Sequence, residues 1–114
     1  MMFNDTVTLY NRLPDESYKR TELPGVYWYD TASYNASVQR PSDDASIIIP
    51  YRSGYVDAFD GTGETWTLKP GDLIVQGIGP EIERAKDLDA PRVISRVIKA
   101  TVDSALAHWE VTVK

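Results

Sequence analysis

The sequence contains no cysteine, so neither a disulfide framework nor a thiolate metal site is available to it. It contains a single histidine, His108. Its longest aliphatic runs are three residues, as at 47–49 and 73–75, whereas a membrane-spanning helix needs about 20 apolar residues. No basic region followed by an apolar block opens the chain, as it would in a signal peptide. These absences predict a soluble protein that does not enter a membrane and needs no disulfide.

Positive charge is also scarce. Twelve basic residues stand against 17 acidic ones, which gives a formal net charge of −5. This balance argues against binding nucleic acid by neutralising phosphates. The length, 114 residues, predicts one domain, residues 1–114, which buries roughly two thirds of its unfolded surface in one core.

What the sequence does contain is alternation of polar and apolar residues, the pattern of half-buried strands. It occurs most clearly at residues 5–12, 65–77 and 108–114. We interpret 65–77 as a hairpin, because Pro70 presets its φ and Gly71 is free to take a positive φ. Shorter aromatic or β-branched runs at 26–29, 47–49 and 92–102 predict further strands.

Turn and helix signals separate these runs. Leu23-Pro24-Gly25 predicts a turn before the strand at 26–29, with a possible edge strand at 18–21 preceding it. Residues 81–88 carry Ile82, Ala85 and Leu88 at three-residue spacing, which predicts a helix of one or two turns.

The fold class that follows is all-β: a small antiparallel β-barrel or sandwich of six to seven strands, with long loops and at most one short helix. Within 92–102, Val93, Val97 and Thr101 are expected on one face, and Ile94 and Ile98 on the other. The apolar members of the alternating runs predict the core: Val7, Leu9, Val26, Trp28, Ile48, Trp66, Leu68, Val75, Val97, Trp109 and Val111.

No residue pattern indicates a catalytic, metal or cofactor site. His108 has no nucleophile or orienting carboxylate at a diagnostic spacing. The acids of 57–64 lack the ligand spacing of a calcium loop. Residues 77–81 resemble a phosphate-binding glycine loop but lack the third glycine, and Pro80 removes a donor. We therefore expect no enzyme activity, and a small hydrolase is the least favoured interpretation.

Two long segments, 30–46 and 51–64, lack a core-forming period and are expected to project from the barrel. Their apolar side chains would be exposed on a lone monomer, so we predict that they contact other proteins. The predicted contact residues are Tyr34, Tyr51, Tyr55, Val56 and Phe59.

Five segments taken together resemble a known group of proteins. They are residues 3–12, 24–28, 47–50, 66–72 and 108–111. The group consists of small proteins encoded among the head and tail genes of tailed bacteriophages and prophages of Gram-positive bacteria, described as minor capsid, head-closure or head-tail connector proteins.

The resemblance implies a structural virion protein, assembled in the cytoplasm of the bacterial host. Its copies would form a ring between the portal or adaptor protein and the tail proteins. Genomic DNA would pass through without sequence-specific binding, and an acidic wall suits such a conduit because it repels phosphate. The resemblance supplies no catalytic residues or cofactors. The alternative is a monomeric ligand- or carbohydrate-binding β module that uses exposed tyrosines as its platform.

Overall fold

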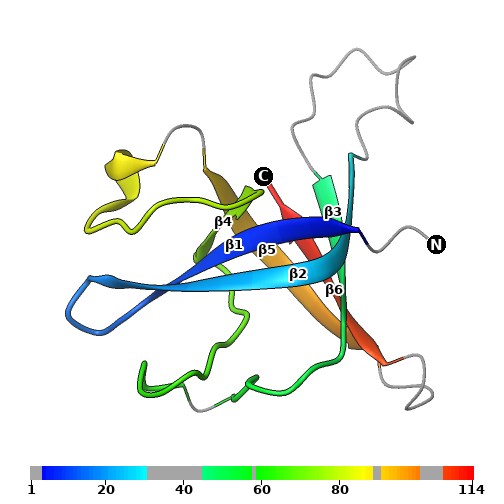
Figure 1. Cartoon of the computed structure of the whole chain (residues 1–114), viewed down its shortest axis with the longest axis horizontal. Coiled ribbons are helices and arrows are strands. Elements are labelled where there is room, and N and C mark those ends of the chain that lie inside the picture. The colour runs from blue at the N-terminus through cyan, green and yellow to red at the C-terminus, as the bar shows by residue number, and fades with distance from the viewer. Residues whose placement is uncertain (1–3, 31–44, 58, 89–90, 101–106) are drawn as a thin grey trace.

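The computed structural model describes residues 4–30, 45–57, 59–88, 91–100 and 107–114. In this part of the chain six antiparallel strands close into a small barrel (Figure 1). The strands are β1 (Asp5–Arg12), β2 (Tyr18–Asp30), β3 (Ala45–Pro50), β4 (Leu73–Gln76), β5 (Arg92–Ala100) and β6 (His108–Val113). Their order around the barrel is β1-β2-β3-β6-β5-β4, and β4 pairs with β1 to close it. The all-β prediction is confirmed, and the closure identifies a barrel rather than a sandwich.

Strand β1 is buried on both faces. Val7 and Leu9 point into the barrel and are fully buried, as their alternation predicts. Thr8 and Tyr10, on the opposite face, are fully buried as well. The chain that follows β4 covers them, and the Tyr10 hydroxyl donates a hydrogen bond of 2.7 Å to the Pro80 carbonyl. Outside the barrel, Tyr10 therefore joins a second small cluster with Leu73 and Leu88.

The predicted turn at 23–25 is wrong, because β2 runs through these residues without a break. Gly25 has a φ of 70°, and the pairing between β1 and β2 shifts register beside it. The turn-forming residues therefore make a β-bulge, which inserts an extra residue and bends the strand. Strand β2 pairs with β1 as far as Val26 and with β3 from Tyr27 onward. One long strand thus belongs to both halves of the barrel.

The predicted hairpin at 65–77 is only half right. Its turn is present, with Gly71 at a φ of 95°, and its second arm is β4. Residues 65–68 form no strand and make only an isolated bridge, between Trp66 and Tyr55. Strand β4 pairs with β1 and β5 instead.

The Asn11 side chain explains why the first arm does not pair as a strand. Its Nδ2 donates to the Thr67 carbonyl at 2.8 Å, and its Oδ1 accepts from the Thr67 N–H at 3.2 Å. Because one amide side chain occupies both backbone groups of Thr67, a ladder cannot use them.

Two further expectations about which side chains face inward need correction. Ile47 and Ile49 are fully buried, and Ile48 lies half-buried on the outer face, opposite to the prediction. In β5 the pairing with β6 shifts between Ile94 and Arg96, so a bulge breaks the alternation. Ile94 is buried, and the next inward residue is Val97, three positions later. The expected grouping of Val93 with Val97 is therefore wrong, and Thr101 lies outside the described residues.

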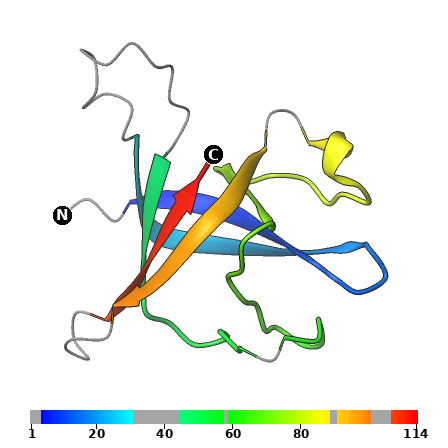
Figure 2. The same ribbon diagram turned by 180° about the vertical axis from the view of Figure 1, so that it is seen from behind.

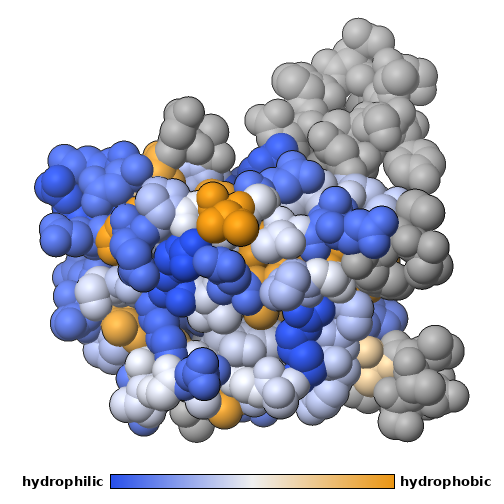
Figure 3. All heavy atoms as spheres, in the orientation of Figure 1, coloured by the Kyte–Doolittle hydropathy of each residue, from blue (hydrophilic) through white to orange (hydrophobic). Residues whose placement is uncertain are grey.

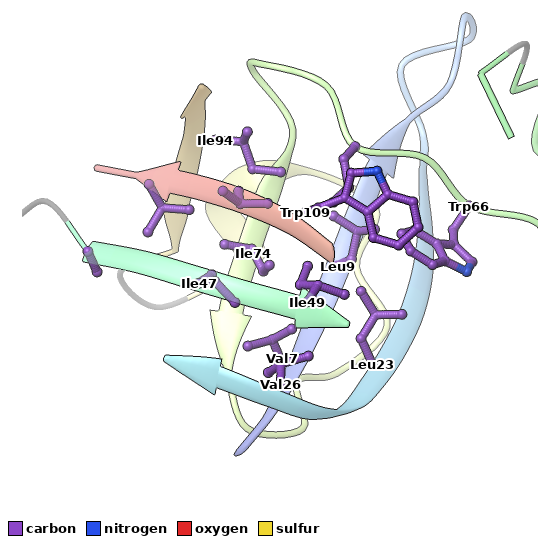
Figure 4. Close-up of a cluster of buried hydrophobic side chains, with 14 residues drawn as sticks. Val7, Leu9, Leu23, Val26, Ile47, Ile49, Trp66, Ile74, Ile94 and Trp109 are labelled. Carbon is purple, nitrogen blue, oxygen red and sulfur yellow. The ribbon is translucent and has the colours of Figure 1, made fainter. Parts of the chain in front are cut away.

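The barrel core is one cluster of buried apolar side chains drawn from all six strands and from residues 66–68 (Figure 4). It confirms seven of the predicted core residues: Val7, Leu9, Val26, Trp66, Leu68, Trp109 and Val111. Trp28 and Val97 are partly buried and pack against this cluster, whereas Val75 packs against the small cluster around Tyr10.

The predicted helix at 81–88 is reduced to a single 3-10 turn, η2 (Ala85–Asp87). Asp87 accepts hydrogen bonds from the N–H groups of Glu83 and Arg84, at 3.1 and 3.0 Å, and these bonds hold the turn. Within the described residues, no helix is long and apolar enough to cross a membrane.

Candidate interaction surface

The connection between β3 and β4, residues 51–72, folds over one end of the barrel and is drawn in green in Figures 1 and 2. It holds four of the five predicted contact residues, namely Tyr51, Tyr55, Val56 and Phe59. Tyr34 lies outside the described residues.

An aromatic cluster attaches the first part of this connection to the barrel. The Tyr51 ring stacks on Trp109 with a centroid distance of 4.7 Å. The Tyr55 ring lies 4.7 Å from Trp109 and 5.4 Å from Trp66. Trp66 and Trp109 are themselves 5.5 Å apart and lie side by side in Figure 4. Tyr55 therefore packs at the edge of the core, whereas Tyr51 remains 53% exposed.

Backbone contacts continue the attachment. The Val56 N–H donates to the Trp66 carbonyl, and the Trp66 N–H donates to the Gly54 carbonyl, both at 2.9 Å. The Nζ atoms of Lys19 and Lys69 each lie 6.0 Å from the centroid of the Phe59 ring, within the range of cation–π attraction.

Two glycines allow the loop to approach the barrel closely. A Cβ on Gly54 would lie 2.7 Å from Trp66 Nε1, and a Cβ on Gly61 would lie 2.6 Å from Leu13 Cδ2. Arg52 adds hydrogen bonds to the carbonyls of Pro24 and Gly25 at the β2 bulge. The described part of the loop is thus packed against the barrel, contrary to the expectation that it projects.

A buried polar network attaches the second part of the connection. Asp72 is 2% exposed, and its carboxylate accepts from Asn11 Nδ2 at 2.7 Å and from the Arg12 N–H at 3.2 Å. Lys69 Nζ lies 2.9 Å from Asp72 Oδ2 and supplies the balancing charge. A buried charge is tolerated when it is paired and hydrogen-bonded in this way. We call Asn11, Asp72 and Lys69 the polar latch.

A groove of about 600 Å³ lies between the connection and the β1–β2 turn. Its lining includes apolar Leu13, Pro14, Tyr55, Phe59 and Leu68, and charged Arg12, Asp57 and Lys69. Its cations are already engaged, because Arg12 pairs with Glu16 at 2.8 Å and Lys69 pairs with Asp72.

Three apolar side chains that are not among the predicted contact residues are also exposed. Ile78 is 72% exposed, and Val93 and Ile98 are each 41% exposed. Ile78 follows the strand β4, and the other two lie on β5. Ile98 lies on the face opposite Val97, as predicted, whereas the bulge in β5 explains why Ile94 faces inward and Val93 outward. Figure 3 shows that apolar groups on the face in view are small and surrounded by hydrophilic residues.

The residues considered for chemistry have local partners in the structure. His108 Nε2 lies 3.2 Å from Glu110 Oε2 on the same strand. Asp60 accepts hydrogen bonds from the N–H and hydroxyl of Thr62, which lower the pKa of its carboxyl group. No group of three or more metal-ligating side chains is found among the residues that the structure describes.

Comparison with known proteins gives one positive result. No curated protein and no solved structure matches the chain. One family model, described as a family of unknown function (DUF6751), matches residues 2–114. The chain described above therefore belongs to the family of unknown function DUF6751.

Proposed function

We propose that this chain is a structural protein of a tailed phage or prophage particle, and that its copies form the head-closure ring between portal and tail. The observation that carries the proposal is the closed barrel. The segments that resemble connector proteins fall on β1, β2, β3 and β6, and on residues 66–72, of which Trp66 and Leu68 belong to the core. Four of the six barrel strands therefore include residues from these segments.

Charge supports the same role. A ring through which the genome passes must not retain DNA, and a formal net charge of −5 disfavours binding to phosphate. The portal or adaptor protein would lie on one side of the ring and the tail proteins on the other. In this proposal the protein has no enzymatic activity, needs no cofactor, and reaches the virion after assembly in the host cytoplasm.

Deleting the gene from the phage or prophage that encodes it tests the proposal. We expect DNA-filled heads that leak or fail to join tails in electron micrographs, with normal particles restored by the wild-type gene in trans. The protein should also be found in purified virions by mass spectrometry. Infectious, fully joined particles from the deletion strain would refute the proposal.

The contact role of Tyr51 and the neighbouring loop needs a test that spares the barrel. Shortening 51–64 would remove the packing of Tyr55 and the hydrogen bonds of Arg52. The exposed Tyr51 and Asp57 can be changed instead, as Tyr51→Ser and Asp57→Lys. We expect a folded protein that fails to complement the deletion; full complementation by both variants would exclude these residues from the contact.

The groove beside Tyr55 and Phe59 favours a second candidate, a monomeric ligand- or carbohydrate-binding module. This candidate predicts a protein that stays monomeric and binds a sugar or small molecule with loss on Phe59→Ala. Sedimentation and a ligand screen distinguish it from the ring protein.

A further inference from the structure

Strand β2 has a free edge along its first half. Residues 18–26 pair with β1 on one side, and β2 pairs with β3 only from Tyr27 onward. On its other side, the stretch 18–26 forms no backbone–backbone hydrogen bond with any residue that the structure describes. In Figure 1 the blue ribbon of β1 and β2 extends to the left, away from β3. An edge of this kind is a template for pairing with another chain.

The pairing of β1 determines which backbone groups of β2 point to this edge. The Thr6 carbonyl accepts from the Gly77 N–H, on the β4 side of β1. Because backbone groups alternate in direction along a strand, the odd-numbered residues of β1 direct theirs toward β2. They pair with the odd-numbered residues of β2 between Lys19 and Leu23. The N–H and C=O groups of Arg20 and Glu22 therefore point to the free edge.

The side chains of Arg20 and Glu22 do not cover this edge. They pair with each other at 2.7 Å on the outer face of the barrel, where Arg20 lies opposite Tyr10. Arg20 Nε also donates to the Gly79 carbonyl at 2.6 Å. Pro24, which has no N–H to donate, lies at the end of the free edge, a position that suits proline.

A groove of about 460 Å³ follows the free edge, and we call it the β2 groove. Its lining comes from residues 19–24 of β2 and from the connection, which contributes Arg52, Ser53, Gly63, Glu64 and Trp66. Strand addition requires an unpaired edge and space beside it. The first half of β2 has both.

Arg52 supplies a positive charge to the β2 groove. Its guanidinium donates to the carbonyls of Pro50, Pro24 and Gly25, which uses three of its five N–H groups. No acidic side chain in the described ranges forms a salt bridge with it. Arg52 is therefore fixed beside the end of the free edge, with two N–H groups and an unneutralised charge available to a carboxylate.

We infer that the free edge of β2 accepts an extended segment of a partner protein as an added strand, and that a carboxylate of this segment binds Arg52. The segment pairs with the N–H and C=O groups of Arg20 and Glu22. Backbone pairing supplies affinity for any extended chain, and the charge of Arg52 selects an acidic one. The inference does not depend on the proposed ring, because it follows from the strand edge and from Arg52 alone.

Two hexapeptides with blocked ends serve as probes. Both have the core Thr-Val-Thr-Val; one carries glutamate at each end and the other carries glutamine. Either strand direction then places a charged or a neutral side chain beside Arg52. In NMR titrations we expect the glutamate peptide to bind with a Kd roughly fivefold lower than that of the glutamine peptide, because a charge-assisted bond is stronger than a neutral one. Equal Kd values would overturn the inference.

Amide hydrogen exchange distinguishes strand addition from side-chain binding. At a glutamate-peptide concentration of about ten times Kd, the N–H groups of Arg20 and Glu22 should exchange roughly tenfold more slowly. The N–H groups of Thr21 and Leu23 should change little, because they point to β1. Slowing that is absent at Arg20 and Glu22, or equal at all four residues, contradicts the added strand.

Arg52→Gln removes the charge and should make the two peptides bind equally. Arg96→Gln is the matched control: Arg96 is exposed on β5, outside the β2 groove, and it too forms no salt bridge with the described part of the chain. This control changes the net charge by the same amount and should keep the preference for the glutamate peptide. A preference that survives Arg52→Gln, or is lost in Arg96→Gln, is evidence against the site.

Glu64→Gln keeps the test decisive if Arg52→Gln does not fold, which circular dichroism would show. Glu64 is exposed, lines the β2 groove and has no salt-bridge partner among the described residues. Its charge opposes an incoming carboxylate, so its removal should lower the Kd of the glutamate peptide roughly twofold and leave that of the glutamine peptide unchanged. Unchanged or weaker binding of the glutamate peptide would refute the proposed recognition.

Two further results would assign the edge to a different occupant. If a higher protein concentration alone slows exchange at Arg20 and Glu22, the edge pairs with a second copy of this chain. If a short oligothymidylate binds through Arg52 while the glutamate peptide does not, the ligand is a nucleic-acid phosphate. Either result overturns the inference of an acidic protein segment.

Discussion

The connection 51–72 is attached to the barrel in two chemically different ways. Its first part is held by the rings of Tyr51, Tyr55, Trp66 and Trp109, which are in contact at centroid distances of 4.7–5.5 Å. Its second part is held by the polar latch, in which each buried polar group depends on a specific partner. Stacked rings bury area and tolerate small shifts, whereas a buried network fails when one member is removed. One loop can therefore combine ring contacts that tolerate small shifts with hydrogen bonds that require specific partners.

The largest loss of stability is expected when a ring of the aromatic cluster is removed. Trp109 is fully buried, so Trp109→Ala should lower the free energy of unfolding by about 3–5 kcal/mol, through lost burial and the cavity left behind. Urea denaturation measures this. Trp109→Phe is the control, because it keeps a ring in place, and Trp109 Nε1 has no hydrogen-bond partner among the described residues. A loss under about 1 kcal/mol for the alanine variant would contradict its placement in the core.

Removing the centre of the polar latch should cost less. Asp72→Ala removes the carboxylate that accepts from the Arg12 N–H and from Asn11 Nδ2, which keeps only its bond to the Thr67 carbonyl, and this predicts a loss of about 2–3 kcal/mol. Lys69→Met should cost under about 1 kcal/mol, because the Lys69 side chain is 46% exposed. Equal losses for the two variants would show that the ion pair, and not the buried hydrogen bonding, stabilises the latch.

Alanine variants at two glycines distinguish the cost of steric contact with the aromatic cluster from the cost of backbone strain. Gly54 and Gly63 have φ values of 98° and 63°, so alanine is strained at either position. A Cβ on Gly63 would meet no atom within 4 Å, whereas one on Gly54 would meet the Trp66 ring. We expect Gly54→Ala to destabilise by about 1–2 kcal/mol more than Gly63→Ala in thermal melts. Similar losses would mean that the Trp66 ring moves aside readily.

The smallest effect concerns alkaline pH. Burial raises the pKa of Tyr10, in β1, and of Tyr55, in the aromatic cluster, above 10.0. Both phenols are neutral when folded, so the stability that they contribute is fully present below pH 10.0. It is lost as the pH rises through their folded pKa values, at no more than about 1.4 kcal/mol per pH unit for each proton.

Tyr10→Phe and Tyr55→Phe should each reduce this alkaline loss, measured by urea melts between pH 8 and pH 11, a range of about three units around the phenol pKa. Tyr10→Phe should also lower stability at neutral pH, because the hydrogen bond to the Pro80 carbonyl is removed. If the free energy of unfolding falls with pH as steeply in both variants as in the wild type, the alkaline loss of stability arises from lysines.

The sequence reveals the barrel wherever alternation is strict. Val7 and Leu9 in β1, and Trp109 and Val111 in β6, are inward as predicted, because period-two patterning determines which face is buried. Alternation carries no information where three isoleucines are consecutive, which is why Ile48 was placed on the wrong face. It also misleads at bulges, which shift the period by one residue, as at Gly25 and in β5.

The exposure of the predicted contact residues was harder to infer from the sequence. Tyr51 could be singled out as an aromatic residue in a long segment, and it is exposed. The burial of Tyr55 against Trp66 depends on residues far along the chain, and no local pattern encodes it. The exposure of Ile78 depends on the glycines beside it being bonded to β1, which is again a tertiary effect. The sequence did not indicate that Asn11 and Asp72 form a buried hydrogen-bond network, because Asn and Asp are both common in loops.

The shortness of β4 sets where the barrel opens first. Strand β4 pairs with β5 only at Leu73–Val93 and Ile74–Arg92, extended by the bonds that Ile94 makes with Gly71 and Asp72. Strand β1, by contrast, pairs with β2 along its whole length. Opening the β4–β5 seam therefore breaks few bonds and turns the closed barrel into an open sheet without unfolding the β1–β2 ribbon. Amide hydrogen exchange in this barrel should proceed through that partial opening, with the N–H of Ile94 exchanging well before those of β1.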